Sequence, residues 1–561
     1  KHQGGDHITP AQRGCRSDRS NARAGKGRTA TWIADRKACG CAQRRGLKAS
    51  LRDPSACADA TRIAGVRLDS RRVEAGDLFV AVPGTRVDGA AFVADARRRG
   101  AAAVVCDRAH APADLPAIVA SDVAAAAGYL SSAFYGDPSD ALEVVGVTGT
   151  NGKTSCTYLL EAVWKAAGKR AGVVGTIVQR CGSFERTSSM TTPSAVDLQA
   201  LLGEMLGHGC DSVAMEVSSH ALDQRRVAGC HFRAALFTNL TRDHLDYHSS
   251  EDSYFAAKAS LFREYLQPGR GVAVLNADDA RVSTLVAELS RHDVWTVSTA
   301  SGSRARAHVV SAECTLGGID AVFELGGASV TIRSPLVGAA NLSNLLAVAA
   351  LARATGVEVD AIASGLSACP AVPGRMERIV AAEADDGSGP AVFVDYAHTP
   401  DALERSLRAL VGEASGRIIV VFGCGGDRDR GKRPIMGRIA AELAHAAVLT
   451  SDNPRSEDPH AILEEIEHGI GARKTRRSAA ELAARGTGGY LVEADRLVAI
   501  ETAIAIATPV DVVLIAGKGH EDYQETAGTR RHFDDREVAR AMLARRLQGK
   551  VAAGPDGPTG R

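Results

Sequence analysis

A glycine-rich loop after an apolar strand constrains this chain most. The apolar run Val144–Val147 leads into Thr148-Gly149-Thr150-Asn151-Gly152-Lys153-Thr154-Ser155, and helical periodicity follows from Tyr158 to Val163. Glycines let backbone N–H groups surround phosphate oxygens, lysine neutralises phosphate charge, and a threonine hydroxyl at a helix N-terminus can ligate Mg²⁺. The loop therefore predicts triphosphate binding. The expected ligands are Gly149, Thr150, Asn151, Gly152, Lys153, Thr154 and Ser155.

The loop is a variant of the usual phosphate-binding pattern. That pattern has a glycine five residues before Gly152, where this chain has Val147. A chance Gly-Lys-Thr in a surface turn is the alternative interpretation. The strand before the loop and the helix after it argue against chance.

Size and composition exclude several classes of protein. With 561 residues the chain is too long for one hydrophobic core, and three domains are expected. Lys and Arg number 67 against 66 Asp and Glu, so no net field favours nucleic acid. No apolar run approaches the roughly 20 residues that span a membrane. The 12 cysteines include no CxxC pair, which is typical of reduced thiols and predicts a cytoplasmic protein.

Alternating strands and helices predict an α/β fold in three domains. We expect a basic leader (1–55), a small N-terminal α/β domain (56–138), a central P-loop ATPase domain with a mostly parallel sheet (139–373), a Rossmann-like C-terminal domain (374–550) and a flexible tail (551–561). The leader is interpreted as disordered rather than as a nucleic-acid-binding arm. The segment 472–489, rich in Arg, Ala and Gly, is expected to be a mobile insertion.

Apolar runs locate the strands of these domains. In the N-terminal domain they are 77–82 and 102–106, with a helix at 92–100 between them. In the central domain they are 171–175, 212–217 and 234–239, and in the C-terminal domain 391–396, 417–423 and 512–517.

Polar residues end two central strands, where an open α/β sheet binds its ligand. Glu216 lies in Met-Glu-Val-Ser-Ser-His, and His244 lies in Asn-Leu-Thr-Arg-Asp-His. Glu216 and Thr154 could supply oxygen ligands to Mg²⁺, and His244 could be a nitrogen ligand or an orienting group for a second ion. Either residue alone is more often structural, but their order after a P-loop favours a metal role.

These motifs together resemble those of the Mur ligases. The resemblance runs from Leu68 to about Glu537. Besides the loop and the two strand ends, it is carried by Tyr254-Phe255-Ala256-Ala257-Lys258, Gly338-Ala339-Ala340-Asn341-Leu342-Ser343-Asn344, Pro373-Gly374-Arg375-Met376-Glu377, Asp395-Tyr396-Ala397-His398-Thr399-Pro400 and Gly517-Lys518-Gly519-His520-Glu521.

The resemblance implies ATP-dependent amide-bond formation in peptidoglycan precursor synthesis through an acyl phosphate. The implied substrates are UDP-N-acetylmuramoyl-L-alanyl-D-glutamate and meso-2,6-diaminopimelate, with L-lysine as the alternative amino acid. A monomer is expected, with ATP and two Mg²⁺ ions. A P-loop switch protein that hydrolyses nucleotide is the contrasting class, and it would not need the motifs of the third domain.

The resemblance also implies roles for individual residues. Lys153, Lys258, Glu216 and His244 are implied to be catalytic, with Lys258 carbamylated by CO₂. The implied metal ligands are Thr154, Glu216, His244 and Lys258. Asn341, Arg375 and Asp395 are implied to join the loop in binding ATP. The muramoyl dipeptide is assigned Ser70, Thr191, Thr192, Ser218, Gln224 and Arg226. Diaminopimelate is assigned Arg428, Asp452, Asn453, Arg455, Gly517 and Glu521.

Arg455 bears on the choice of amino acid. Diaminopimelate differs from lysine by one distal carboxylate, which suits a planar guanidinium. Arg455 follows Asp452-Asn453-Pro454, and the resemblance associates this motif with diaminopimelate. The alternative is that Arg455 merely caps a turn after Pro454.

Overall fold

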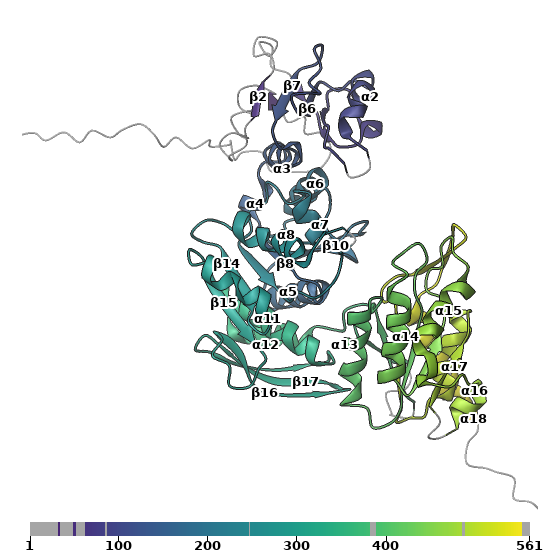
Figure 1. The fold of residues 1–561 in the computed structure, drawn as a ribbon. Helices are drawn as coiled ribbons and strands as arrows, with labels where there is room; N and C mark the ends of the chain where they lie inside the picture. Colours follow the sequence, from purple (N-terminus) through teal and green to yellow (C-terminus); the bar gives the residue numbers. More distant parts are fainter. Residues whose placement is uncertain are drawn as a thin grey trace, which may run out of the picture.

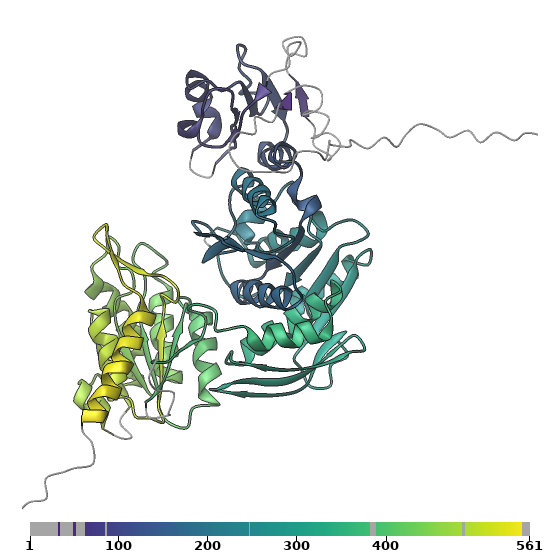
Figure 2. The same cartoon turned by 180° about the vertical axis from the view of Figure 1, so that it is seen from behind.

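Three α/β units follow one another along the chain. The computed structural model describes residues 32–33, 49–51, 62–84, 87–245, 247–381, 389–484 and 488–552. The central unit lies between the other two, and the three form a bent arrangement (Figures 1 and 2). Each unit has its own sheet, so the expected α/β class in three units is confirmed.

The N-terminal unit is a small sheet. Its order is β2 (Ala49–Leu51), β7 (Ala117–Ala120), β6 (Ala103–Cys106), β5 (Leu78–Val80) and β4 (Val66–Arg67). Helices α2 (Val93–Arg98) and α3 (Val123–Phe134) pack on it, and β1 (Trp32–Ile33) pairs with β3 (Arg62–Ile63). Strands β1 and β2 fall within the segment expected to be a leader, most of which lies outside the described residues, as does nearly all of the expected tail.

The central unit is built on an 11-stranded sheet. Its parallel centre has the order β9 (Ala171–Val174), β12 (Ser212–Glu216), β8 (Glu143–Thr148), β13 (Ala234–Phe237), β14 (Val272–Asn276) and β15 (Asp293–Ser298). Antiparallel pairs extend both ends. One end carries β10 (Val178–Cys181) and β11 (Phe184–Thr187), and the other β16 (Ala307–Thr315), β17 (Gly318–Leu325) and β18 (Ser329–Ser334).

Helices cover both faces of this sheet. On one face Val145 and Val147 of β8 join α5 (Lys153–Ala166), α11 (Ala339–Ala354) and α12 (Val359–Ala368) in one apolar cluster. On the other face Val144 joins α6 (Ala195–Gly207) and α8 (Glu251–Glu264). A strand buried on both faces has a continuous apolar sequence, which explains the run before the P-loop.

The C-terminal unit is a six-stranded sheet with helices on both faces. Its order is β19 (Glu377–Ile379), β20 (Ala391–Asp395), β24 (Val512–Ala516), β21 (Ile418–Phe422), β22 (Ala446–Leu449) and β23 (Gly489–Val492), and only β19 is antiparallel. Helices α13 (Pro400–Val411), α14 (Lys432–Leu443) and α15 (Pro459–Ile470) cover one face. Helices α17 (Arg496–Ile506) and α18 (Asp535–Ala552) cover the other.

The segment expected to be a mobile insertion contains regular structure, although most of its described residues are exposed. It contains α16 (Ala479–Ala483), whose capping box is formed by Ser478 and Glu481. Leu482 is fully buried in the C-terminal core, and the Arg477 N–H donates to the Tyr490 carbonyl. The Arg- and Ala-rich composition of the segment gave no sign of a helix. The buried leucine and the capping box nevertheless stabilise one short helix. Residues 485–487 lie outside the described part.

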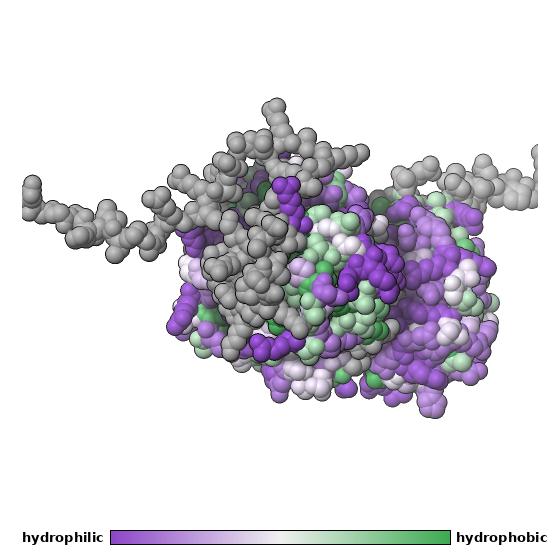
Figure 3. Space-filling view, turned by 90° about the horizontal axis from the view of Figure 1, so that it is seen from above, coloured by the Kyte–Doolittle hydropathy of each residue, from purple (hydrophilic) through white to green (hydrophobic). Residues whose placement is uncertain are grey.

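Shorter elements complete the fold. They are η1 (Ser70–Arg72), η2 (Gly89–Phe92), α4 (Pro138–Ala141), α7 (Ser219–Asp223), α9 (Ala280–Ser283), α10 (Leu285–Glu288), η3 (Gly471–Arg473), β25 (Tyr523–Thr526) and β26 (Thr529–His532). From above, the visible face of the C-terminal unit is mostly hydrophilic (Figure 3). None of the described helices is both long and apolar enough to cross a membrane.

Candidate functional site

The P-loop joins β8 to α5 in a backbone conformation that requires glycine. Gly149 has φ 142° and Gly152 has φ 87°, values that other residues rarely adopt. A Cβ on Gly149 would lie 2.0 Å from Thr238 Oγ1, and one on Gly152 would lie 2.5 Å from Asn344 Oδ1. The loop is therefore pressed between β13 and α11, and its shape fits phosphate binding.

Two lysines meet at the first glycine of the loop. Lys153 Nζ donates to the carbonyls of Gly149 and Thr150, each at 2.9 Å, and Lys258 Nζ of α8 donates to Gly149 at 2.8 Å. Lys258 is 1% exposed. Burial and the neighbouring Lys153 charge hold the pKa of Lys258 well below its usual value, and burial lowers the pKa of Lys153. A lowered pKa favours the neutral form of an amine, which is the nucleophilic form.

Glu216 lies at the end of β12, beside the loop. The carboxylate is 1% exposed and accepts from Thr176, at 2.8 Å from the N–H and 3.0 Å from the hydroxyl. Its charge acts on Lys153, partly offsetting the effect of burial on that pKa. Thr154 is also buried, and its Oγ1 accepts from Arg375 at 3.4 Å.

His244 occupies a left-handed backbone conformation with φ 52°. Its ring lies 4.9 Å from that of His220 and 6.1 Å from that of Tyr254, between centroids. Within the described residues, no group of three or more His, Cys, Asp and Glu side chains could hold a metal by itself. The hydroxyl of Thr154 and the carboxylate of Glu216 are nevertheless the hard oxygen donors that suit Mg²⁺.

Two asparagines of α11 face the loop. Asn341 Nδ2 donates to the Val337 carbonyl at 2.9 Å, and Asn344 Nδ2 donates to Asn341 Oδ1 at 3.2 Å. Asn344 Oδ1 therefore faces Gly152 and also accepts from the Cys156 thiol at 3.5 Å. The sequence motif contained Asn344, but only Asn341 was assigned to the site. The spacing of one helical turn could have identified the second residue.

Arg375 links the central and C-terminal units. It donates to Thr154 on one side and stacks 4.5 Å from the Tyr396 ring on the other. Asp395 holds the turn behind it, accepting from the N–H groups of Met376 at 2.7 Å and Ala397 at 3.0 Å and from the Ser406 hydroxyl at 2.9 Å. Burial raises the pKa of Asp395. In this structure Asp395 supports the turn that carries Arg375, whereas its nucleotide contact stays a prediction.

Five of the residues assigned to the muramoyl dipeptide form one network. Thr192 Oγ1 donates to the Glu216 carbonyl at 2.8 Å and accepts from the Ser218 N–H at 3.1 Å. Arg226 donates to the Thr192 carbonyl at 3.2 Å and to Gln224 Oε1 at 2.6 Å. Thr191 pairs with Thr176, the partner of Glu216, at 3.0 Å. This network therefore adjoins the P-loop.

Ser70 lies in a different unit from this network. It is 5% exposed, and its hydroxyl donates to Asp95 Oδ2 at 2.9 Å. The uridine contact of Ser70 stays a prediction.

Two arginines converge at the carboxyl ends of β21 and β22. A Cβ on Gly425 would lie 2.9 Å from Arg455 Nη1 and 3.8 Å from Arg428 Cγ. Arg455 has φ 54° and donates to the Gly426 carbonyl at 2.7 Å. A left-handed conformation at a non-glycine residue is costly and marks functional positions. The two arginines therefore place two positive charges close to Gly425.

Acidic residues lie next to these arginines. Asp452 is 7% exposed, and the Oδ2 of this residue lies 3.5 Å from where a Cβ of Gly517 would be. Asn453 Nδ2 donates to Glu521 Oε2 at 2.9 Å. Burial and Asp452 raise the pKa of Glu521. Two arginines beside two carboxylates can bind a molecule that carries both carboxylate and ammonium groups.

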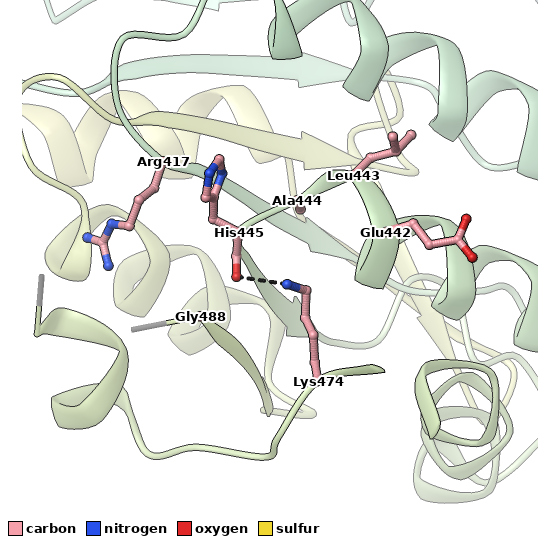
Figure 4. A pocket seen from close by; sticks show the side chains of 7 residues that line it. All are labelled: Arg417, Glu442, Leu443, Ala444, His445, Lys474 and Gly488. Carbon is pink, nitrogen blue, oxygen red and sulfur yellow. Dashed lines mark hydrogen bonds between the residues drawn. The ribbon is translucent and has the colours of Figure 1, made fainter. Parts of the chain in front are cut away.

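A separate pocket lies at the opposite end of the C-terminal sheet. It is lined by Arg417, Glu442, Leu443, Ala444, His445, Lys474 and Gly488 (Figure 4). Three of these residues lie directly before the first residue of a strand: Arg417 before β21, His445 before β22 and Gly488 before β23. Open α/β sheets bind ligands at the carboxyl ends of strands, and this pocket contains none of the predicted site residues.

Models of known families match all three units. Residues 62–135 match the Mur ligase family catalytic domain, residues 147–352 the Mur ligase middle domain, and residues 374–519 the Mur ligase glutamate ligase domain.

Similar proteins cover most of the chain. UDP-N-acetylmuramoyl-L-alanyl-D-glutamate–2,6-diaminopimelate ligase from Gloeobacter violaceus is 47% identical over 488 residues, covering 86% of this chain and 94% of that protein. The protein of the same name from Synechococcus elongatus is 45% identical over 494 residues, with the same coverage of 86% and 94%.

Solved structures agree with this similarity. A structure titled with the same ligase name has a TM-score of 0.63 and 33% identity, and the match covers 87% of this chain and 96% of that one. MurF from Acinetobacter baumannii shares the fold, with a TM-score of 0.58, 19% identity, and coverage of 91% and 98%.

Proposed function

Because this chain belongs to the Mur ligase family, we propose that it joins meso-2,6-diaminopimelate to UDP-N-acetylmuramoyl-L-alanyl-D-glutamate at the expense of ATP. The proposal is carried by one observation, the pocket of opposite charges formed by Arg428 and Arg455 beside Asp452 and Glu521. Diaminopimelate has an ammonium and a carboxylate at its distal end, and this pocket offers a partner to each. Relatives at 45–47% identity carry the corresponding name.

The reaction proceeds in two displacements. A carboxylate oxygen of the D-glutamyl residue attacks the γ-phosphorus of ATP, the bond to the β,γ-bridging oxygen breaks, and ADP leaves with its electron pair. The amine of diaminopimelate then attacks the acyl phosphate carbon, loses a proton, and expels phosphate. Lys153 neutralises charge on the transferred phosphoryl group, and the glycines of the loop position it.

Arg375 and Asn341 are the further nucleotide contacts in this proposal. Arg375 already reaches Thr154 from the C-terminal unit, so a phosphate held at Thr154 lies within reach of a second cation. Asp395 keeps the turn of Arg375 in place. A ligand bound at the P-loop would thus be contacted by residues of both the central and the C-terminal units.

Lys258 is carbamylated in the active enzyme. Its neutral amine attacks the carbon of CO₂, an N–C bond forms, and one proton leaves to solvent. The anion that results lies beside Lys153, whose charge stabilises it. Thr154, Glu216, His244 and the carbamate would hold Mg²⁺. When bound, Mg²⁺ neutralises phosphate charge in the transition state.

L-lysine is the alternative amino acid at this step. It lacks the distal carboxylate, so its binding would leave the guanidinium of Arg455 without an anionic partner. Meso-diaminopimelate is therefore the preferred substrate of this proposal. The reaction belongs in the cytoplasm, where thiols stay reduced, and the described cysteines form no disulfide with one another.

Phosphate release by the purified protein tests the proposal against a nucleotide switch. Complete mixtures contain ATP, the UDP-linked dipeptide and diaminopimelate, and controls omit each one. The proposal expects phosphate release only in the complete mixture, with one tripeptide product per phosphate by mass spectrometry. Equal ATP turnover without the other two substrates would support the switch instead.

A further inference from the structure

Lys518 is a fully buried cation behind the proposed amino-acid pocket. It follows Gly517 at the end of β24 and is 0% exposed. Its Nζ donates to Asn453 Oδ1 at 3.3 Å and to the Tyr523 carbonyl. The same nitrogen lies 3.7 Å from Glu521 Oε2 and 4.0 Å from Asp452 Oδ1. Lys518 therefore lies within 4.0 Å of all three polar side chains on the acidic side of the pocket, which are those of Asp452, Asn453 and Glu521.

The first consequence concerns the orientation of the Asn453 amide. Its Oδ1 accepts from Lys518 and from the Glu525 N–H at 3.0 Å. Two donors on one side fix that atom as the oxygen, so the amide nitrogen must face Glu521. Lys518 and the Glu525 N–H together therefore determine which way Asn453 points, and through it where the Glu521 carboxylate lies.

The second consequence concerns charge. Asp452 and Glu521 each carry a negative charge, Lys518 carries one positive charge, and the buried pair Arg496–Asp535 is neutral. On this side of the pocket the carboxylates therefore outnumber the cations by one, and Arg428 and Arg455 lie on the other side. Asp452 Oδ1 is buried and, within the described residues, has no hydrogen-bond partner. A buried carboxylate oxygen without a hydrogen bond is costly, and a ligand ammonium would supply the missing donor.

Lys518 also favours the ionised form of Glu521. Burial and Asp452 raise the pKa of Glu521, whereas Lys518 lowers it. Without the lysine, a proton on Glu521 would remove the negative charge that an ammonium needs.

We propose that Lys518 is a positioning residue that determines recognition of the distal ammonium group of the incoming amino acid. The inference rests on the proposed function. It differs from a structural role, in which Lys518 would only tie the end of β24 to the Tyr523 carbonyl.

The test compares two substrates that differ in the distal amine. The first is meso-diaminopimelate, and the second is 2-aminopimelate, which keeps the distal carboxylate but lacks the amine. Wild type, Lys518→Met and the milder Lys518→Gln are assayed for the KM of each amino acid, and separately for the KM of ATP. Lys474→Met is the matched control, because Lys474 is a partly buried lysine of the same unit in the distant pocket of Figure 4.

Wild type should discriminate strongly between the two amino acids. In Lys518→Met the ratio of their KM values should fall by about 10-fold, because the diaminopimelate KM rises while the 2-aminopimelate KM changes little. The KM of ATP should stay within about 2-fold of wild type, and Lys474→Met should keep the wild-type ratio.

Each outcome is decisive. A merely structural lysine would impair both amino acids equally and leave the ratio unchanged, which would overturn the inference. Lys518→Gln gives the same comparison if Lys518→Met does not fold. A wild type that does not use diaminopimelate would contradict the proposed function instead.

Discussion

Lys153 and Lys258 donate to the same carbonyl oxygen, that of Gly149, at 2.9 Å and 2.8 Å. Two ammonium groups so close in a buried place repel one another, so Lys258 gives up its proton more easily. A carbamate would turn this repulsion into attraction. The contact therefore explains why a lysine is suited to this position.

Replacing Lys258 should remove most activity. Lys258→Ala should lower kcat by about 100-fold or more, since it removes an anionic group from a site that stabilises the transition state. Acetate or another short carboxylate should restore part of the rate. Lys165→Ala, at an exposed lysine of α5, is the control. The modification is checked by NMR, since wild type given ¹³C-labelled bicarbonate should show a carbamate signal. Full activity in Lys258→Ala would refute the modification.

His520 predicts a pH dependence of stability. Burial and the cations Arg375 and Arg536 lower its pKa from 6.5 to about 3. Between these values the unfolded chain binds a proton that the folded protein does not, so stability falls as pH falls from 6.5 toward 3. Relative to His520→Gln, wild type should lose up to about 1.4 kcal/mol of unfolding free energy per pH unit. If the unfolding free energies of wild type and His520→Gln, measured in urea, changed with pH in parallel, the lowered pKa of His520 would be contradicted.

Asp401 should hold the C-terminal unit against the P-loop. Asp401 Oδ2 of α13 accepts from Asn151 Nδ2 at 3.2 Å and from Thr241 Oγ1 at 3.1 Å. Asp401→Ala removes both hydrogen bonds, each contributing about 1 kcal/mol. Distances between spin labels on the two units should then spread more widely than in wild type. The control Glu404→Ala, on the same helix, should keep the wild-type distribution of distances. A wild-type distribution in Asp401→Ala would contradict this role of the contact.

Arg455 should set the preference between amino acids. Lysine at this position keeps the charge but cannot form two parallel hydrogen bonds to a carboxylate. Arg455→Lys should therefore lower the preference for diaminopimelate over L-lysine by about 10-fold or more, measured as a ratio of kcat/KM values. An unchanged ratio would place the specificity on other residues.

Much of the fold could be predicted from local patterns. The strand before the P-loop and those of the C-terminal sheet are continuous apolar runs, because parallel strands are buried on both faces. Strands β16, β17 and β18 were not predicted. Exposed or partly exposed residues alternate with buried ones along β17 and β18, whereas β16 is mostly exposed, and the strand pairing shows that all three extend the central sheet.

The site could be predicted only as a set of motifs. The sequence indicates that Lys153, Glu216 and Arg455 carry chemistry, but not which side chains they contact. Asn151 and Asp401 are far apart along the chain and meet only through the orientation of two units. The burial of Lys518 depends likewise on strands β22 and β24 lying in one sheet. Such contacts follow from packing rather than from periodicity.

The most direct test of this account is a competition for the wild-type protein. Equal concentrations of meso-diaminopimelate and L-lysine are offered with ATP and UDP-N-acetylmuramoyl-L-alanyl-D-glutamate, and the products are separated by mass. The account predicts a tripeptide ending in diaminopimelate as nearly the whole product, with one phosphate released for each molecule formed. A product ending mainly in L-lysine, or phosphate release with no tripeptide, would contradict it.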